Sequence, residues 1–261
     1  MMGTASAQGE LWSGSPRDWA KFQEPLFTPI YQAVLEAAGI GSGRRVLDVG
    51  CGSGLFCHLA AQRGAQVAGV DAAPGMIDIA KSLTPAGDFH VGEMEELPFG
   101  DDTFDLVAGF NSFQFAADPV NALRNAQRVA KPNGKISMAI WGVAQDCEAA
   151  SVLKAQSSLL PPPPPGAPGP FALSEPGRLE ALLLQAGLKA GPATNVDTPF
   201  TFSTMDAGCR AFMGSGPGSA ALRLNSEEKV RATLGEALAP FKQPDGSYRL
   251  ENKFKFVVAS A

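Results

Sequence analysis

Three glycines spaced two apart are the residues of this sequence most suited to holding a ligand. Residues 46–54 read VLDVGCGSG, an apolar run that carries Asp48 and ends in Gly50, Gly52 and Gly54 before a helical pattern begins. Because glycine has no Cβ, such a turn can adopt positive φ and let a ligand approach the main chain closely. The pattern predicts a strand that turns tightly onto a nucleotide-like ligand.

A second carboxylate follows at a distance typical of nucleoside sites. The segment AQVAGVDAAPGMIDIAK predicts a strand that ends at Asp71, about twenty residues beyond Gly50. A carboxylate there can accept hydrogen bonds from both ribose hydroxyls. Dinucleotide-binding turns need their third glycine where this chain has Leu55, so the spacing disfavours a pyrophosphate ligand.

A third segment makes the pattern more specific. Residues 92–115 read GEMEELPF followed by GDDTFDLVAGFNSFQF, and with the glycine turn and Asp71 they resemble the class I S-adenosylmethionine-dependent methyltransferases that act on small molecules. The resemblance covers residues 40–142. It implies S-adenosyl-L-methionine as the methyl donor and S-adenosyl-L-homocysteine as the product.

The resemblance also implies roles for the matching positions. The backbone of the glycine turn would hold the methionine and ribose, Asp48 would orient the ammonium group, and Asp71 would bind the ribose. Met76 would pack beside the adenine, and Glu93, where many relatives have Asp, would accept from its exocyclic amine. The expected donor-binding residues are Asp48, Gly50, Cys51, Gly52, Gly54, Asp71, Ala72, Met76, Glu93, Met94, Phe110, Asn111 and Phe115.

No catalytic base is evident in the sequence. Gln114 and Phe115 stand where numerous family members have paired histidines, and the two histidines of this chain, His58 and His90, are interpreted as structural. We therefore leave the catalytic residue unassigned and expect catalysis mainly by proximity and orientation. The expected lining of a small, apolar substrate pocket is Trp19, Phe22, Tyr31, Gln114, Trp141, Phe171 and Arg210.

Strands and helices alternate strictly from Arg45 to Trp141, which predicts an α/β fold with a parallel sheet and helices on both faces. The resemblance implies a Rossmann-like, mostly parallel sheet of seven strands whose last strand is antiparallel. We expect cap helices in residues 1–40, the donor-binding core in 41–142 and a Pro-rich lid or linker in 143–173. The rest of the sheet would follow in 174–261, with a helical insertion at about 203–240.

Several segments outside the core carry expectations of their own. Residues 1–16 are small and polar and are interpreted as a mobile lead-in to the cap helices. The run PPPPPGAPGP at 161–170 predicts a stiff spacer, and GSGPGSA at 214–220 predicts a flexible joint. Lys189 to Phe202 reads as one strand, and the alternating KFKFVVASA at the C-terminus reads as a half-exposed edge strand.

Composition narrows the possible partners and location. The 261 residues include 21 basic and 26 acidic ones, a formal charge of −5, with no basic cluster that would suit nucleic acid. No run approaches the roughly 20 apolar residues of a membrane span. Four scattered cysteines predict reduced thiols rather than disulfides or a metal site. We expect a cytoplasmic monomer or homodimer that takes a small-molecule substrate and binds no metal.

Three functions fit these observations to different degrees. The leading interpretation is methyl transfer to an oxygen, nitrogen or carbon of a small, hydrophobic metabolite, such as a polyketide, aromatic or quinone-like compound. The alternative is a regulatory protein that binds S-adenosylmethionine or S-adenosylhomocysteine without catalysis. A nicotinamide-dependent oxidoreductase is disfavoured by Leu55 in the turn.

Overall fold

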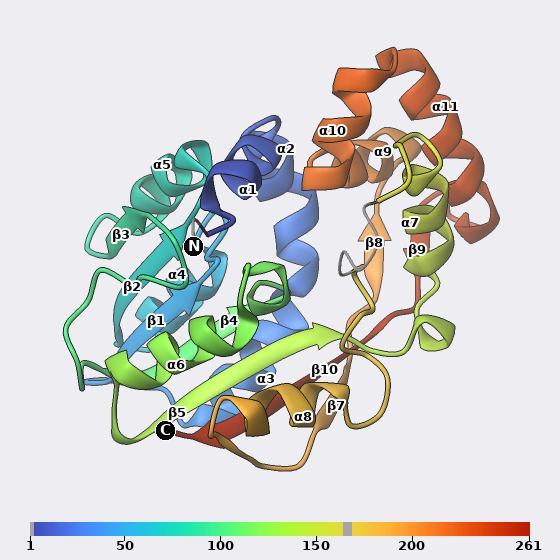
Figure 1. The fold of residues 1–261 in the computed structure, drawn as a ribbon. Coiled ribbons are helices and arrows are strands. Elements are labelled where there is room, and N and C mark those ends of the chain that lie inside the picture. Colours follow the sequence, from blue (N-terminus) through green and yellow to red (C-terminus); the bar gives the residue numbers. More distant parts are fainter. Residues whose placement is uncertain (1–2, 164–168) are drawn as a thin grey trace.

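The computed structural model describes residues 3–163 and 169–261, and its centre is a twisted sheet covered by helices on both faces (Figure 1). Seven strands lie side by side in the order β3 (Asp88–Val91), β2 (Gln66–Asp71), β1 (Arg45–Val49), β4 (Phe104–Phe110), β5 (Ala130–Trp141), β10 (Lys253–Ser260) and β6 (Lys189–Ala190). An eighth strand, β7 (Thr194–Asp197), pairs with β10. The first five strands are parallel and β10 is antiparallel to β5, which confirms the expected topology.

The C-terminal strand β10 is not the half-exposed edge that its alternation suggested. It lies between β5 on one side and β6 and β7 on the other, and it is buried over most of its length. The lysine within the alternation, Lys255, is satisfied inside the protein because its Nζ donates to the carbonyl of Ser174 at 2.9 Å. A buried partner for a charged side chain is a tertiary feature that strand periodicity does not reveal.

The single strand expected at residues 189–202 is three short strands. β6 and β7 both pair with β10, whereas β8 (Phe200–Phe202) leaves the main sheet and pairs with β9 (Tyr248–Leu250). Strand β5 begins at Ala130, and Asn133 adopts a φ of +64° within it. The strand therefore contains a local irregularity at Asn133.

Two apolar clusters hold the helices onto the sheet. One contains residues of α3 (Thr28–Ala38), α4 (Leu55–Gln62) and α5 (Pro74–Leu83), and the other contains residues of α6 (Pro119–Val129) and α8 (Arg178–Gln185). Helix α6 begins where Asp118 accepts hydrogen bonds from the next turn's N–H groups, which is the usual role of an N-cap aspartate. Alternate residues of the strands therefore contribute to two separate hydrophobic cores.

Residues 3–16 are not the mobile lead-in that their composition suggested. They form α1 (Ala5–Trp12) and the start of α2 (Pro16–Asp18), which continues into the helical turns η1 (Trp19–Gln23) and η2 (Glu24–Phe27) before α3. Three further short 3₁₀ turns are η3 (Phe113–Phe115), η4 (Ala144–Asp146) and η5 (Ala239–Phe241). The N-terminal segment is therefore helical almost throughout and lies over the sheet's edge near α5 (Figure 1).

A second helical group gathers at one end of the molecule, at the upper right of Figure 1. It consists of α7 (Ala149–Ser157), α9 (Met205–Met213), α10 (Gly216–Leu224) and α11 (Glu227–Leu238). The segment expected to be a flexible joint instead begins α10, where Ser215 caps the helix by accepting from the N–H of Gly218. The proline-rich spacer lies partly outside the described residues, because 164–168 are not among them.

In residues 3–163 and 169–261, no helix has both the length and the apolar character needed to cross a bilayer. All four cysteines are buried and free.

Candidate functional site

The glycine turn after β1 has the backbone geometry that its sequence predicts. Gly50, Gly52 and Gly54 all adopt positive φ, at +77°, +53° and +87°. A Cβ on Gly50 would lie 2.5 Å from the Cβ of Ser112, and one on Gly54 would lie 2.7 Å from that of Ala80. Only glycine allows this combination of left-handed backbone and close packing.

Asp71 at the end of β2 holds the turn in place. Its two carboxylate oxygens accept hydrogen bonds from the backbone N–H groups of Gly52 and Ala73, each at 2.9 Å. The carbonyl of Val70 accepts from the N–H groups of Gly50 and Cys51 at 2.7 and 3.0 Å. The expected ribose-binding carboxylate and the glycine turn are therefore parts of one hydrogen-bonded unit.

Two further carboxylates are buried beside this unit. Asp48 in β1 is 3% exposed, and its Oδ1 has no hydrogen-bond partner. Glu24, from η2 of the N-terminal segment, is 2% exposed and accepts from the hydroxyl of Ser53. A Cβ on Gly52 would lie 3.0 Å from Oε1 of Glu24, so this acid covers the middle of the turn.

Burial of these acids affects their protonation. Burial raises the pKa of Glu24 to about 7, and burial together with the charges of Glu24 and Asp71 raises the pKa of Asp48 well above its ordinary value. Burial also raises the pKa of Asp71. Across the described part of the chain, none of the three acids forms an ion pair with a basic side chain.

Such a site suits a positively charged organic ligand. Three buried carboxylates without cationic partners disfavour an anion, because like charges in a low-dielectric interior repel strongly. Within the described residues, no cluster of His, Cys, Asp and Glu side chains could hold a metal ion. The cationic sulfonium and ammonium groups of S-adenosyl-L-methionine therefore fit the chemistry of the residues present.

The cavity beside the turn is small because helix α1 lies over it. Its volume is about 20 Å³, room for about one water molecule. Its lining residues are Thr4, Ala5, Gln8, Gly50, Val70, Asp71, Ala72, Gly92, Glu93 and Met94. An adenosyl group is far larger than this volume, so a nucleoside bound at this turn would need part of the space that α1 occupies.

Specific contacts hold α1 in that position. The N–H of Ala5 donates to Oε2 of Glu93 at 2.8 Å, and the hydroxyl of Thr4 donates to the carbonyl of Phe115 at 2.9 Å. Gly9 approaches so closely that an added Cβ would lie 2.4 Å from the carbonyl oxygen of Ala72. Three of the expected donor-binding positions, at residues 72, 93 and 115, thus contact the N-terminal helix.

The remaining expected donor-binding residues have mainly structural contacts. Met76 is fully buried in α5 and does not line the cavity. The ring of Phe110 packs 4.5 Å from that of Tyr31. Asn111 adopts a φ of +49°, and its Oδ1 accepts from the N–H of Trp141 at 3.2 Å, which fastens the end of β4 to β5.

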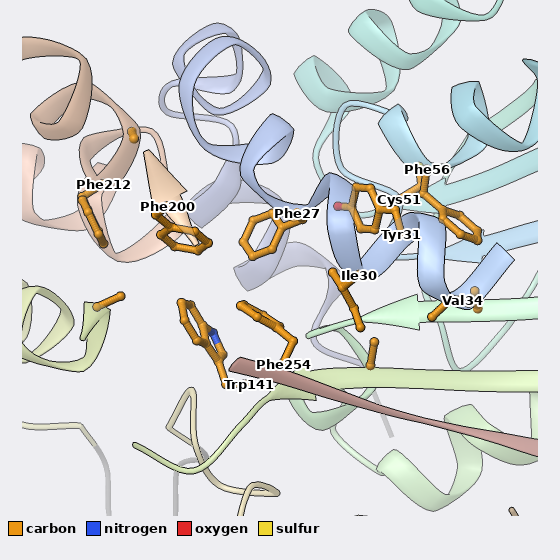
Figure 2. Close-up of a cluster of buried hydrophobic side chains, with 14 of the residues drawn as sticks. Phe27, Ile30, Tyr31, Val34, Cys51, Phe56, Trp141, Phe200, Phe212 and Phe254 are labelled. Atoms are coloured by element: carbon orange, nitrogen blue, oxygen red, sulfur yellow. The ribbon is translucent and has the colours of Figure 1, made fainter. Parts of the chain in front are cut away.

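Two of the expected substrate residues, Trp141 and Tyr31, pack among aromatic rings of the core. Trp141 and Tyr31 belong to the row of buried rings in Figure 2, where Trp141 packs 4.4 Å from Phe254 and Tyr31 packs 6.2 Å from Phe27. Neither the cavity at the turn nor a second cavity beside β5 is lined by any of the seven residues. Tyr31 and Trp141 therefore contribute to the core.

Two other expected substrate residues are engaged with each other. The guanidinium of Arg210 lies 4.4 Å from the ring centre of Phe22 and forms an ion pair with Asp18 at 2.6 Å. Trp19 packs edge-on against Trp12 at 4.9 Å, Phe171 packs against Trp141 at 5.6 Å, and Gln114 is buried with its Oε1 unpartnered. The charge of Arg210 is thus paired with Asp18 inside the chain.

Neither histidine lies in the cavity at the turn. His58 in α4 is within hydrogen-bond distance of Thr84 and Gln62, and His90 in β3 pairs with Asp88 at 2.7 Å. Sequence reasoning missed Glu24 and helix α1. The available signal was an acid directly before a proline in the aromatic-rich stretch WAKFQEPLF, where a surface position is not expected.

The sequence around this site is similar to one family of known proteins. A sequence model of the family described as "Methyltransferase domain" matches residues 47–138. Malonyl-[acyl-carrier protein] O-methyltransferase of Serratia marcescens is 36% identical over 101 residues, which cover 38% of this chain and 40% of that protein. Ubiquinone biosynthesis O-methyltransferase of Azorhizobium caulinodans is 41% identical over 96 residues, which cover 35% and 38%.

The matched segment spans less than half the length of these curated relatives. Over a longer stretch, the crystal structure of the YcgJ protein from Bacillus subtilis has a TM-score of 0.58 at 20% identity, with 88% of this chain and 97% of that chain covered. At that identity the likeness concerns the fold alone. The sequence match lies on the part of the fold that carries β1, the glycine turn, Asp71 and Glu93.

Proposed function

We propose that this chain, whose residues 47–138 belong to the methyltransferase-domain family, transfers the methyl group of S-adenosyl-L-methionine to a small-molecule acceptor. The observation that supports this most is the group of three buried acids at the glycine turn, which have no basic partner in the described part of the chain. Glu24, Asp48 and Asp71 are carboxylates without a cationic partner there. The donor carries positive charge, whereas the pyrophosphate of a nicotinamide dinucleotide would add negative charge.

The residues of the site have distinct parts in this proposal. Asp71 accepts hydrogen bonds from the ribose, Glu93 accepts from the adenine amine, and Asp48 faces the ammonium end of the donor. When bound, the donor supplies an electrophilic methyl group on its sulfonium. The protein's contribution is to orient donor and acceptor and to exclude water, and orientation of this kind can supply on the order of 7 to 11 kcal/mol.

The acceptor is proposed to be a small and mostly hydrophobic metabolite. Both relatives named above are O-methyltransferases, which supports an oxygen acceptor over a nitrogen or carbon one. The many aromatic side chains around the helical groups support an apolar substrate. Four buried, unpaired cysteines support a reducing location such as the cytoplasm.

A second candidate is a protein that binds the donor or its product without catalysis. It is favoured by the positions of His58 and His90, which hydrogen-bond to neighbouring residues away from the cavity. A methyl acceptor that loses its proton to water, or a nucleophilic carbon, needs no protein base. The two candidates therefore differ in turnover and not in ligand.

Two measurements test the proposal. Calorimetry with S-adenosylhomocysteine and with NADH should show binding of the first and none of the second, and the reverse result would remove the methyltransferase assignment. Transfer of a labelled methyl group from the donor to an extract of small metabolites then separates an enzyme from a binding protein. Tight binding with no labelled product from any fraction would favour the non-catalytic candidate.

A further inference from the structure

We infer that Glu24 is a donor-recognition residue, whose carboxylate pairs with the positive charge at the methionine end of S-adenosyl-L-methionine. This inference rests on the proposed function, and it adds a residue from the N-terminal segment that the family resemblance does not supply. It makes residues before β1 part of the donor site. Glu24 would then connect closure of the N-terminal helices to the presence of the charged donor.

The position of Glu24 brings its carboxylate onto the glycine turn. Glu24 lies over Gly52, where the absence of a side chain makes room for this carboxylate. Its carboxylate accepts from the hydroxyl of Ser53 and is further stabilised by the backbone N–H groups of Ser53 and Leu55. The indole Nε1 of Trp19 would lie 3.1 Å from a Cβ on Gly52, and it is buried without a partner.

Glu24 has no internal counter-charge in the described part of the chain. Five titratable groups from the elements around the turn interact electrostatically with Glu24. They are Tyr31 of α3, Asp48 of β1, Cys51 of the turn, Cys57 of α4 and Asp71 of β2. Each of these groups is neutral or negative. An ionised Glu24 therefore faces only neutral groups or charges of its own sign.

The burial of Glu24 affects its protonation. Burial raises the pKa of Glu24 to about 7, so near neutral pH a substantial fraction of the molecules carry a proton there. A positive charge brought within a few ångströms favours the ionised form, which lowers the pKa. Donor binding should therefore release a proton near pH 7, which an acid with only a structural role would not do.

The inference is tested by calorimetry on the full-length protein and on Glu24→Gln. Titrations with S-adenosylmethionine at pH 7, in two buffers of different ionisation enthalpy, give both the affinity and the number of protons released. We expect the wild type to release a proton in part and Glu24→Gln to bind at least tenfold more weakly with that release lost. Glutamine keeps the shape and the hydrogen-bond acceptor but removes the charge.

Two other ligands identify the group that Glu24 recognises. S-adenosylhomocysteine keeps the ammonium but lacks the sulfonium charge, and 5′-methylthioadenosine lacks both. A loss of affinity for S-adenosylmethionine alone identifies the sulfonium as the partner, and an equal loss for S-adenosylhomocysteine identifies the ammonium. In either case affinity for 5′-methylthioadenosine should not fall.

A matched control and a second variant keep the test decisive. Glu36→Gln makes the same chemical change at a side chain that is 72% exposed on α3, and it should bind like the wild type. If Glu24→Gln does not fold, Glu24→Asp retains the charge and should still release a proton. If Glu24→Gln kept wild-type affinity and proton release, or bound more tightly, the inference would be overturned. A wild type that binds neither S-adenosylmethionine nor S-adenosylhomocysteine would instead overturn the proposed function.

Discussion

The backbone N–H of Ala5 donates a hydrogen bond to the carboxylate of Glu93 at 2.8 Å, although the two residues are 88 positions apart in the chain. Glu93 is the residue expected to accept from the adenine amine. Helix α1 and an adenine ring would therefore compete for the same carboxylate. If Glu93 has the proposed role, the N-terminal helix in the position described here is a barrier to nucleoside entry.

Removal of residues 1–13 should therefore speed the association of S-adenosylhomocysteine. The cavity at the turn would open directly to solvent, and the step in which α1 leaves would no longer be needed. Stopped-flow tryptophan fluorescence measures the association rate, with Trp19 near the turn as a reporter. An unchanged rate would mean that α1 does not obstruct entry.

The same truncation provides its own folding control. None of the residues of α1 belongs to either apolar cluster, so the free energy of unfolding should change little. Urea denaturation of the truncated and full-length chains compares these values. A large loss of stability would show that α1 supports the core, and the rate measurement would then need a milder variant such as Thr4→Val, which removes one hydrogen bond of α1.

Gly54→Ala should destabilise the protein by about 2 to 4 kcal/mol. The substitution imposes a left-handed backbone on a residue with a Cβ, which costs roughly 1 to 2 kcal/mol, and it also places that Cβ 2.7 Å from the Cβ of Ala80. Gly43→Ala is the matched control, because Gly43 has a φ of +79° but open space where a Cβ would lie. Chemical denaturation of both variants separates strain from crowding.

A double substitution isolates the crowding between the two residues. Ala80→Gly removes the methyl group that the new side chain at position 54 would meet, at a cost of about 1 kcal/mol for glycine in a helix. The pair Gly54→Ala and Ala80→Gly should therefore be more stable than the two single effects predict, by roughly 1 kcal/mol or more. Additive effects would show that the turn moves away from α5 freely.

The central part of the fold was predictable because its signals are local. Glycines that need positive φ, apolar strands and amphipathic helices are all written into short stretches of sequence. For this reason the turn at Gly50, the strand that ends at Asp71 and the helix capped by Asp118 lie where the sequence indicates. The antiparallel last strand followed from the resemblance and not from its own residues.

The features that were missed depend on contacts between distant segments. Residues 5–12 have low hydrophobicity and become a helix over the sheet because their backbone and small side chains fit against Ala72 and Glu93. The buried Lys255 donates a hydrogen bond to the carbonyl of Ser174. The buried Glu24 packs over Gly52, where the missing side chain leaves room for it. No periodicity in the sequence predicts such pairs.

Asp71→Ala should weaken the binding of S-adenosylhomocysteine by about 1.5 to 3 kcal/mol, or roughly ten- to a hundredfold. The change removes the expected ribose acceptor, and it also leaves the N–H groups of Gly52 and Ala73 without their carboxylate. Calorimetry measures the affinity. Asp88→Ala, at an acid that is 67% exposed on the neighbouring strand, is the control and should bind normally. Full affinity in Asp71→Ala would remove this residue from the site.

Glu24→Gln should change how stability depends on pH in the absence of ligand. In the unfolded chain Glu24 titrates near 4.5, and in the folded protein burial raises this pKa to about 7. Between these values the folded state holds a proton that the unfolded state has lost, so the free energy of unfolding falls as pH rises. The fall contributed by this one group is on the order of 3 kcal/mol, and it is complete above about pH 7.

The variant removes that contribution because glutamine does not titrate. Urea denaturation at pH 5, 6, 7 and 8 should therefore show a difference in stability between variant and wild type that shifts in favour of the variant as pH rises. Asp48 titrates in both proteins, but the charge of Glu24 raises its pKa, so the difference between the two curves reports Glu24 together with its coupling to Asp48. Parallel curves would mean that Glu24 titrates normally, and the proton release expected on donor binding would then have to come from another group.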